Sequence, residues 1–183
     1  MITKLKNARI YDPINKINGK IKDLYIKNGR IIDRPKFNEK ISKTIDLKKK
    51  VIMAGGIDIH SHIAGGKVNL ARLLLPEEHR KYLYSSTENL RSGSGLGTCS
   101  SFHIGYKYAK LGYCAVFEPA VLPSNARTAI IEMSDIPFVD KGTYTVLSND
   151  DFLLNLIQKK TSQKKINDYV SWILSSTKGL GVK

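Results

Sequence analysis

The second part of the chain alternates apolar segments of strand length with amphipathic segments of helix length. Strand-like segments lie at 51–59 (VIMAGGIDI), 113–121 (YCAVFEPAV) and 143–147 (TYTVL), and a fourth begins in LGVK at 180–183. Helix patterns lie at 98–110, at 126–134, from Asn149 or Asp150 to Lys160, and at 166–177. Apolar strands that alternate with helices are typical of βαβ units around a parallel sheet. The sequence therefore predicts an α/β fold for residues 51–183, with residues 51–59 as a strand buried on both faces.

The first 50 residues have a different pattern. Residues 21–27 (IKDLYIK) alternate apolar and charged side chains, and Asn28-Gly29 then separates them from RIID. This pattern predicts a β-hairpin with a type I′ turn. Residues 1–50 also carry 15 Lys and Arg against five Asp and Glu, so they hold +10 of the chain's net charge of +14. We expect residues 1–50 to form a separate small β module.

The basic segment is open to three interpretations: a nucleic-acid footprint, a solvated lysine-rich surface, or an interface with an acidic partner. It lacks the pattern of arginine interleaved with aromatic residues with which single-strand binders stack bases, and we expect no nucleic-acid partner. The chain shows no signal-peptide pattern and no apolar run of membrane-spanning length. Cys99 and Cys114 form no CxxC pair, and we expect buried or half-buried thiols in a cytoplasmic protein.

A histidine pair, His60 and His62, directly follows the first apolar strand. On extended backbone, residues i and i+2 project to the same side, so the two imidazoles can bind one metal ion. Zinc is the default metal for such ligands, and Asp58 is available to orient a ring. An HxH sequence also occurs by chance in many loops, but its place after a buried strand favours a metal site.

These segments resemble a known family. VIMAGGIDIHSHIAGG resembles the first barrel strand of the amidohydrolase superfamily, whose members carry a metal-binding HxH there. HSHIAGGKVNLARLLLPEEHR, GYKYAKLGYCAVFEPA and KGLGVK resemble the family of A-type subunits of formylmethanofuran dehydrogenase. The resemblance covers essentially all 183 residues, whereas the family's chains are considerably longer. It implies an incomplete (β/α)8 amidohydrolase-type barrel at 51–183, truncated after its first half and preceded by the β module.

The resemblance also implies a binuclear zinc site, in which a carboxylated lysine on the fourth strand bridges the metals. Lys183 lies inside the incipient strand and is our first choice for this lysine. Lys178 is the second choice, because it lies at a helix end and is equally well explained as a cation near a helix C-terminus. The other ligands and the catalytic aspartate of the family are expected beyond Lys183. We therefore expect no catalytic residue within this chain, and no activity of the 183 residues alone.

The long connection at 63–97 contains several polar residues suited to hold a carboxylate or formate near the metals. These substrate-binding candidates are Lys67, Asn69, Arg72, His79 and Arg80. Alternatively, the basic ones pair with Glu77, Glu78 or Glu88 and hold the loop itself.

The implied reaction is the interconversion of formate plus methanofuran with formylmethanofuran, in CO₂ reduction and methanogenesis. The implied partners are the other subunits of a formylmethanofuran dehydrogenase complex, one of which carries a molybdenum or tungsten pterin. One alternative is a cyclic amidase such as a dihydroorotase or hydantoinase. Another is a non-catalytic fragment of the complex.

Overall fold

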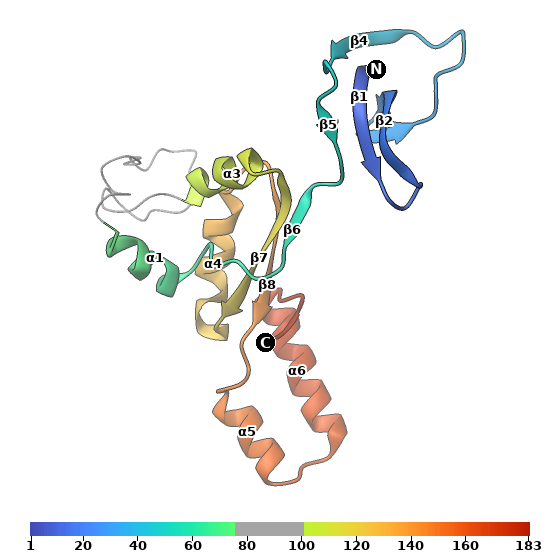
Figure 1. Ribbon diagram of the computed structural model, residues 1–183. Coiled ribbons are helices and arrows are strands. Elements are labelled where there is room, and N and C mark those ends of the chain that lie inside the picture. Colours follow the sequence, from blue (N-terminus) through green and yellow to red (C-terminus); the bar gives the residue numbers. More distant parts are fainter. Residues whose placement is uncertain (76–100) are drawn as a thin grey trace. The chain divides into compact units, whose positions relative to one another are not determined.

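The computed structural model describes residues 1–75 and 101–183 (Figure 1). The chain divides into two compact units, Met1–Ala54 and Gly55–Lys183. Each unit has its own sheet, and the two are described separately.

The N-terminal unit is a five-stranded sheet built around its longest hairpin. Its strands are β1 (Ile2–Asp12), β2 (Ile17–Lys27), β3 (Arg30–Ile32), β4 (Ile41–Asp46) and β5 (Val51–Ile52). The order is β3-β2-β1-β4, and β5 also pairs with β1. β1–β2 and β2–β3 are antiparallel, whereas β4 and β5 run parallel to β1. Ile2, Ala8, Ile10 and Tyr25 are the buried apolar residues of this sheet.

The turn between β2 and β3 is the one that the sequence predicts. Asn28 and Gly29 have φ angles of 52° and 74°. A type I′ turn requires positive φ at both central residues, which asparagine and glycine adopt most readily. The predicted hairpin is confirmed, and Lys27 pairs with Arg30 across it.

The second unit contains a four-stranded parallel sheet of order β6-β7-β8-β9. The strands are β6 (Gly56–Asp58), β7 (Tyr113–Val121), β8 (Asp140–Thr145) and β9 (Gly181–Val182). The helices between them are α1 (Gly66–Leu73), α3 (Ser101–Lys110), α4 (Ala126–Ser134), α5 (Asp151–Gln158) and α6 (Gln163–Thr177), with a 3₁₀ turn, η2, at Pro123–Asn125. This curled parallel sheet with its helices is an incomplete (β/α)8 barrel, as the sequence predicts.

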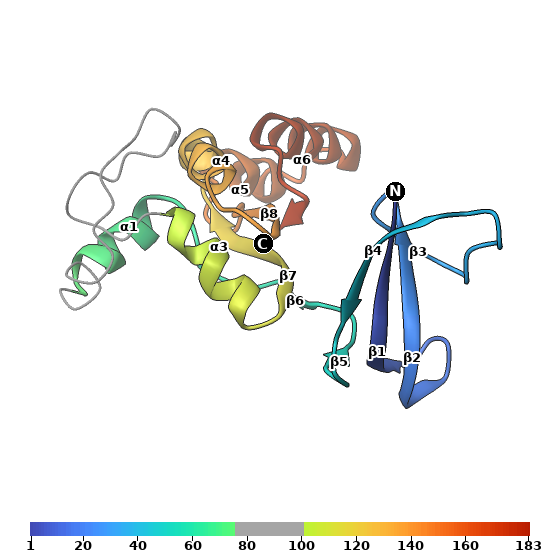
Figure 2. The same ribbon diagram turned by 90° about the horizontal axis from the view of Figure 1, so that it is seen from above.

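The core of this unit lies between β7 and the helices α3 and α4 (Figure 2). Val116 and Val121 of β7 pack with Ala129 and Met133 of α4 in a buried apolar cluster, and Ile104 of α3 packs against it. Ile63 and Ala64, from the loop after β6, belong to the same cluster. The core therefore holds the loop that carries the histidine pair.

The structure corrects several sequence-based boundaries. Residues 51–59 are not one buried strand: β5 pairs with β1 in the N-terminal sheet, whereas β6 begins the parallel sheet. Ile57 and Ile59 are 61% and 63% exposed, so this apolar segment is not buried on both faces. The third strand is Asp140–Thr145 rather than 143–147. Cys114 is exposed rather than buried or half-buried, and Cys99 lies outside the described residues.

The connection at 63–97 is not structureless where the structure describes it. Residues Gly66–Leu73 form α1, and residues 76–97 lie outside the described part. Asp150 caps α5 by accepting a hydrogen bond from the Leu153 N–H at 2.8 Å, as a capping aspartate does. Within residues 1–75 and 101–183, no helix is long and apolar enough to cross a membrane.

Several carboxylates of the N-terminal unit accept hydrogen bonds from neighbouring residues. The pKa values of four of them are lowered, each chiefly by one hydrogen bond: Asp12 from the Asn15 side chain, Asp23 from the Lys4 side chain, Glu39 from the Lys27 side chain, and Asp46 from the Lys48 backbone. A carboxyl whose pKa is lowered by folding stabilises the fold above its unfolded pKa, and this contribution is lost as the pH falls through the folded pKa.

We expect the N-terminal sheet to lose stability in acid, below about pH 4, where unfolded carboxyls become protonated. The measurement is amide hydrogen exchange of β1, β2 and β4 at pH 7 and pH 3, corrected for the intrinsic exchange rate. Asp23→Asn removes one of the four carboxyl groups. In this variant the protection of the strand amides is expected to change less between the two pH values than in the wild-type protein. Equal protection at both pH values would contradict the prediction.

Gly105 allows α3 to pack closely against Pro137 in the second unit. Gly105 is buried, and a Cβ there would overlap the carbonyl oxygen of Pro137. Gly105→Ala is expected to destabilise the protein by about 1–3 kcal/mol through overpacking, although alanine favours helix by about 1 kcal/mol. Urea unfolding measures the change. Gly66→Ala is the control, since its Cβ would meet nothing nearer than Asn125 Nδ2 at 3.9 Å. Equal stability of the two variants would contradict the close approach.

Candidate functional site

The loop at 59–65, between β6 and α1, follows a path set by a buried carboxylate of β7. Glu118 is 1% exposed, and its Oε2 accepts hydrogen bonds from the N–H groups of Ile63 at 2.7 Å and Ala64 at 3.2 Å. Buried N–H groups need an acceptor, and a loop has no ladder to supply one. Glu118 therefore anchors the backbone next to His62.

A second buried carboxylate holds the end of the loop. Glu132 of α4 is 7% exposed and accepts hydrogen bonds from Gly65 N–H at 2.8 Å and Asn69 Nδ2 at 2.6 Å. Arg72 donates to Asn69 Oδ1 at 2.8 Å and to the carbonyl oxygen of Ile63 at 2.5 Å. Asn69 and Arg72 thus hold the loop and the start of α1, and their binding of substrate stays a prediction.

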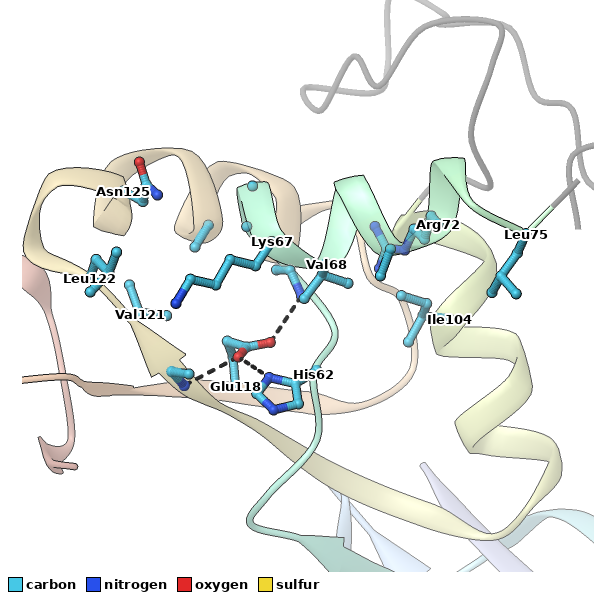
Figure 3. A pocket seen from close by; sticks show the side chains of 16 residues that line it. His62, Lys67, Val68, Arg72, Leu75, Ile104, Glu118, Val121, Leu122 and Asn125 are labelled. Atoms are coloured by element: carbon cyan, nitrogen blue, oxygen red, sulfur yellow. Dashed lines mark hydrogen bonds and ion pairs between the residues drawn. The ribbon is translucent and has the colours of Figure 1, made fainter.

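The ring of His62 lies against Glu118 (Figure 3). Its Nδ1 is 2.9 Å from Glu118 Oε1, which also accepts a hydrogen bond from Ala120 N–H at 3.2 Å. The His62 side chain is 55% exposed, whereas that of Glu118 is 2% exposed. One edge of the imidazole is therefore fixed by a buried group, and much of the rest of the ring is open.

His60, His62 and Lys183 come together although their elements are far apart in sequence. The two imidazole rings lie edge to face, with centroids 5.6 Å apart. Lys183 follows β9, and its Nζ is 3.5 Å from His60 Nε2. The Lys183 N–H donates to the carbonyl oxygen of Thr145 at 2.8 Å, which fixes the lysine backbone beside β8. Lys178 instead occupies the exposed C-cap of α6, with a left-handed φ of 55°.

Asp58 orients the backbone of the histidine segment rather than a ring, which corrects the expectation for this residue. Its Oδ1 accepts a hydrogen bond from His60 N–H at 3.1 Å, and its Oδ2 accepts one from the Tyr108 hydroxyl at 3.3 Å. Tyr108 also bonds to the Ser61 hydroxyl. Burial raises the pKa of the Tyr108 phenol, so the group remains a neutral donor at neutral pH.

The donors present at this site fit a divalent metal such as zinc. When Nδ1 of a neutral imidazole donates to a carboxylate, Nε2 carries the lone pair that a metal requires. His62 Nδ1 lies 2.9 Å from a carboxylate oxygen of Glu118, as this arrangement requires, and His60 Nε2 faces the lysine. Across residues 1–75 and 101–183, no group of three His, Cys, Asp or Glu side chains is placed to hold a metal. A metal held by His60 and His62 would therefore need donors besides these four residue types, or donors from residues that the structure does not describe.

A cavity of about 490 Å³ adjoins the site and is lined partly by His62 and Glu118 (Figure 3). Its wall is largely apolar, with Val68, Ile104 and Val121 among the lining residues, and Lys67 extends along it. An apolar cavity with a few converging polar groups is typical of a small-molecule site. Because Lys67 lines this cavity, it stays a candidate substrate-binding residue. His79 and Arg80 lie outside the described residues.

Sequence reasoning missed Glu118 and Glu132. One signal was available for Glu118, because a glutamate inside the apolar strand YCAVFEPAV is rarely buried without a specific set of donors. Nothing local marks Glu132, since glutamate is an ordinary residue on the exposed face of a helix.

Tyr108 offers a test of the polar cluster under the histidines. Tyr108→Phe removes the hydroxyl that bonds to Ser61 and Asp58, and it is expected to lower the free energy of unfolding by about 1 kcal/mol. Tyr106→Phe is the control on the same helix, since Tyr106 is 47% exposed and packs through its ring against Phe138. Urea denaturation compares the two variants. A Tyr108→Phe protein as stable as Tyr106→Phe would show that the hydroxyl has no anchoring role.

Comparison with known proteins places the chain in a family. The amidohydrolase family pattern matches residues 43–183. Protein FwdA of Methanocaldococcus jannaschii is 36% identical over 179 residues, which are 98% of this chain and 31% of FwdA. The A-type subunit of the formyltransferase/hydrolase complex Fhc of Methylorubrum extorquens is 38% identical over 183 residues, which are 100% of this chain and 32% of that relative.

A solved structure shows the same fold. The crystal structure of the FhcABCD complex from Methylorubrum extorquens, determined with methylofuran, aligns with a TM-score of 0.82 and 37% identity over 100% of this chain and 32% of the matched chain. The chain thus spans about a third of the length of these relatives. Since the family pattern covers most of the chain, the chain belongs to the amidohydrolase family.

Proposed function

We propose that this chain is the N-terminal part of a metal-dependent amidohydrolase that interconverts formylmethanofuran with formate and methanofuran. The observation that carries the proposal is the approach of Lys183 Nζ to 3.5 Å from His60 Nε2, across 123 residues of sequence and beside His62. The similarity to FwdA and to its counterpart in the Fhc complex, over nearly the whole chain, supports this substrate class rather than a cyclic imide.

In this proposal the metal is zinc, held by His60, His62 and a carboxylated Lys183. A lysine ammonium has no lone pair to donate, whereas a carbamate on the same nitrogen presents two anionic oxygens. Bound zinc supplies a Lewis acid for the formyl carbonyl and a nucleophilic water. Lys178 remains the second choice, although its place at the helix C-cap argues against it.

The protein's own residues would position the reactants. Lys67 borders the cavity that His62 also lines, and its ammonium is suited to bind the carboxylate of formate through charge-assisted hydrogen bonds. The apolar wall of the cavity would exclude water from the reacting centre. Asn69 and Arg72 would act indirectly, because they hold the loop that presents His62.

Two zinc ions need more donors than His60, His62 and Lys183 provide. We therefore propose that further ligands and an acid–base aspartate come from residues outside these 183, and that the 183 residues alone are not competent. The relatives that share this fold are about three times as long. We also propose a cytoplasmic complex in which a separate protein component, with a molybdenum or tungsten pterin, reduces CO₂.

Zinc analysis of the full-length protein tests the site. We expect His60→Ala and Lys183→Ala each to remove at least one zinc ion per chain and to abolish formate release from formylmethanofuran. Lys178→Ala is the matched control and is expected to retain zinc and activity. Loss of zinc in Lys178→Ala but not in Lys183→Ala would reverse the lysine assignment. Hydrolysis of a cyclic imide without formate release would favour a cyclic amidase instead.

A further inference from the structure

Glu118 has partners of two kinds. Its Oε2 accepts from the Ile63 and Ala64 N–H groups, whereas its Oε1 lies 2.9 Å from His62 Nδ1 and accepts from Ala120 N–H. All three backbone partners are donors that have no alternative protonation state. The carboxylate therefore acts as an acceptor at both oxygens, and the imidazole nitrogen facing it has to be the donor.

From this geometry we infer that Glu118 is a positioning residue, which fixes His62 in the tautomer with hydrogen on Nδ1 and presents the Nε2 lone pair at the open edge of the ring. The exposure of the two side chains agrees with this role, since the carboxylate is 2% exposed and the imidazole is 55% exposed. A buried acceptor on one edge and an open edge on the other is the arrangement that prepares an imidazole for a metal. The metal-binding consequence rests on the proposed function, whereas the tautomer does not.

The contacts of Glu118 also predict what a glutamine would do there. The Ile63 and Ala64 N–H groups both point at the Oε2 position, whereas one backbone N–H, that of Ala120, points at Oε1, so the amide oxygen of a glutamine is favoured at the Oε2 position. The amide NH₂ then faces His62 Nδ1 and can only donate to it, and the Ala120 N–H loses its acceptor. Glu118→Gln is therefore expected to reverse the tautomer, so that Nδ1 accepts and Nε2 carries the hydrogen.

Glu132 provides a matched control within the same loop. It is also buried, and it also accepts a hydrogen bond from loop backbone, namely from Gly65 N–H at 2.8 Å. Its other recorded bond is to the Asn69 side chain, and no hydrogen bond joins it to an imidazole among the described residues. Glu132→Gln thus perturbs the anchoring of the loop without changing the partner of His62.

The experiment measures the His62 tautomer in the metal-free full-length protein, from the ¹⁵N chemical shifts of labelled histidine. The wild-type protein, Glu132→Gln and Glu118→Asp are expected to show hydrogen on Nδ1, because each keeps an acceptor-only carboxylate at position 118. Glu118→Gln is expected to show hydrogen on Nε2. Zinc affinity, measured by competition with a chelator, is expected to fall about 10- to 100-fold in Glu118→Gln and to change little in Glu132→Gln.

An unchanged His62 tautomer in Glu118→Gln would overturn the inference, and so would a loss of zinc affinity as large in Glu132→Gln as in Glu118→Gln. Reversal of the tautomer in Glu118→Gln alone would support it. Failure of the wild-type protein to hold zinc would overturn the proposed function, and the tautomer measurement distinguishes that failure from failure of the positioning role.

Discussion

The burial of one carboxylate, that of Glu118, fixes the arrangement of the candidate site. Removing a carboxylate from water costs several kcal/mol unless its oxygens are fully hydrogen-bonded. Here the strand β7 supplies the carboxylate, and the loop after β6 supplies two of its backbone donors and the imidazole of His62. Because the anchoring donors are backbone N–H groups, replacing the side chain of Ile63 leaves these bonds in place, whereas truncating Glu118 to alanine removes all of them.

The apolar core and this polar anchor act on the same short segment. Ile63 and Ala64 place their side chains in the cluster beneath α4 while their N–H groups bind Glu118. The apolar contacts hold the two side chains in the core, and the hydrogen bonds to the carboxylate fix the backbone path of the loop. Glu132 anchors the loop in the same way at Gly65, whose N–H it accepts, and so fixes the backbone position at which α1 begins.

Local sequence patterns predicted most of the elements but not how distant segments meet. The Asn28-Gly29 hairpin and the helices of the second unit from α3 onward follow from periodicity and turn chemistry, which act over a few residues, whereas α1 was not predicted. The segment 51–59 was misjudged because apolar composition does not say with which sheet a strand pairs, and this segment contributes to both. The bond between His62 and Glu118 spans 56 residues, and no local pattern specifies it. The bond between Asn69 and Glu132 likewise spans 63 residues, so no local pattern showed that the Asn69 side chain also holds the loop.

The sequence separation between His60 and Lys183 imposes an order on assembly during translation. At about 5–20 residues per second, the ribosome needs roughly 6–25 seconds to add the 123 residues between them. Glu118 emerges within the first half of that interval, so the nascent loop can acquire its anchor and His62 its orientation before Lys183 is made. In the proposed zinc site the lysine would then arrive at a pair of imidazoles that is already arranged, and the speed of elongation would set how long the two histidines stay accessible to metal ions without it.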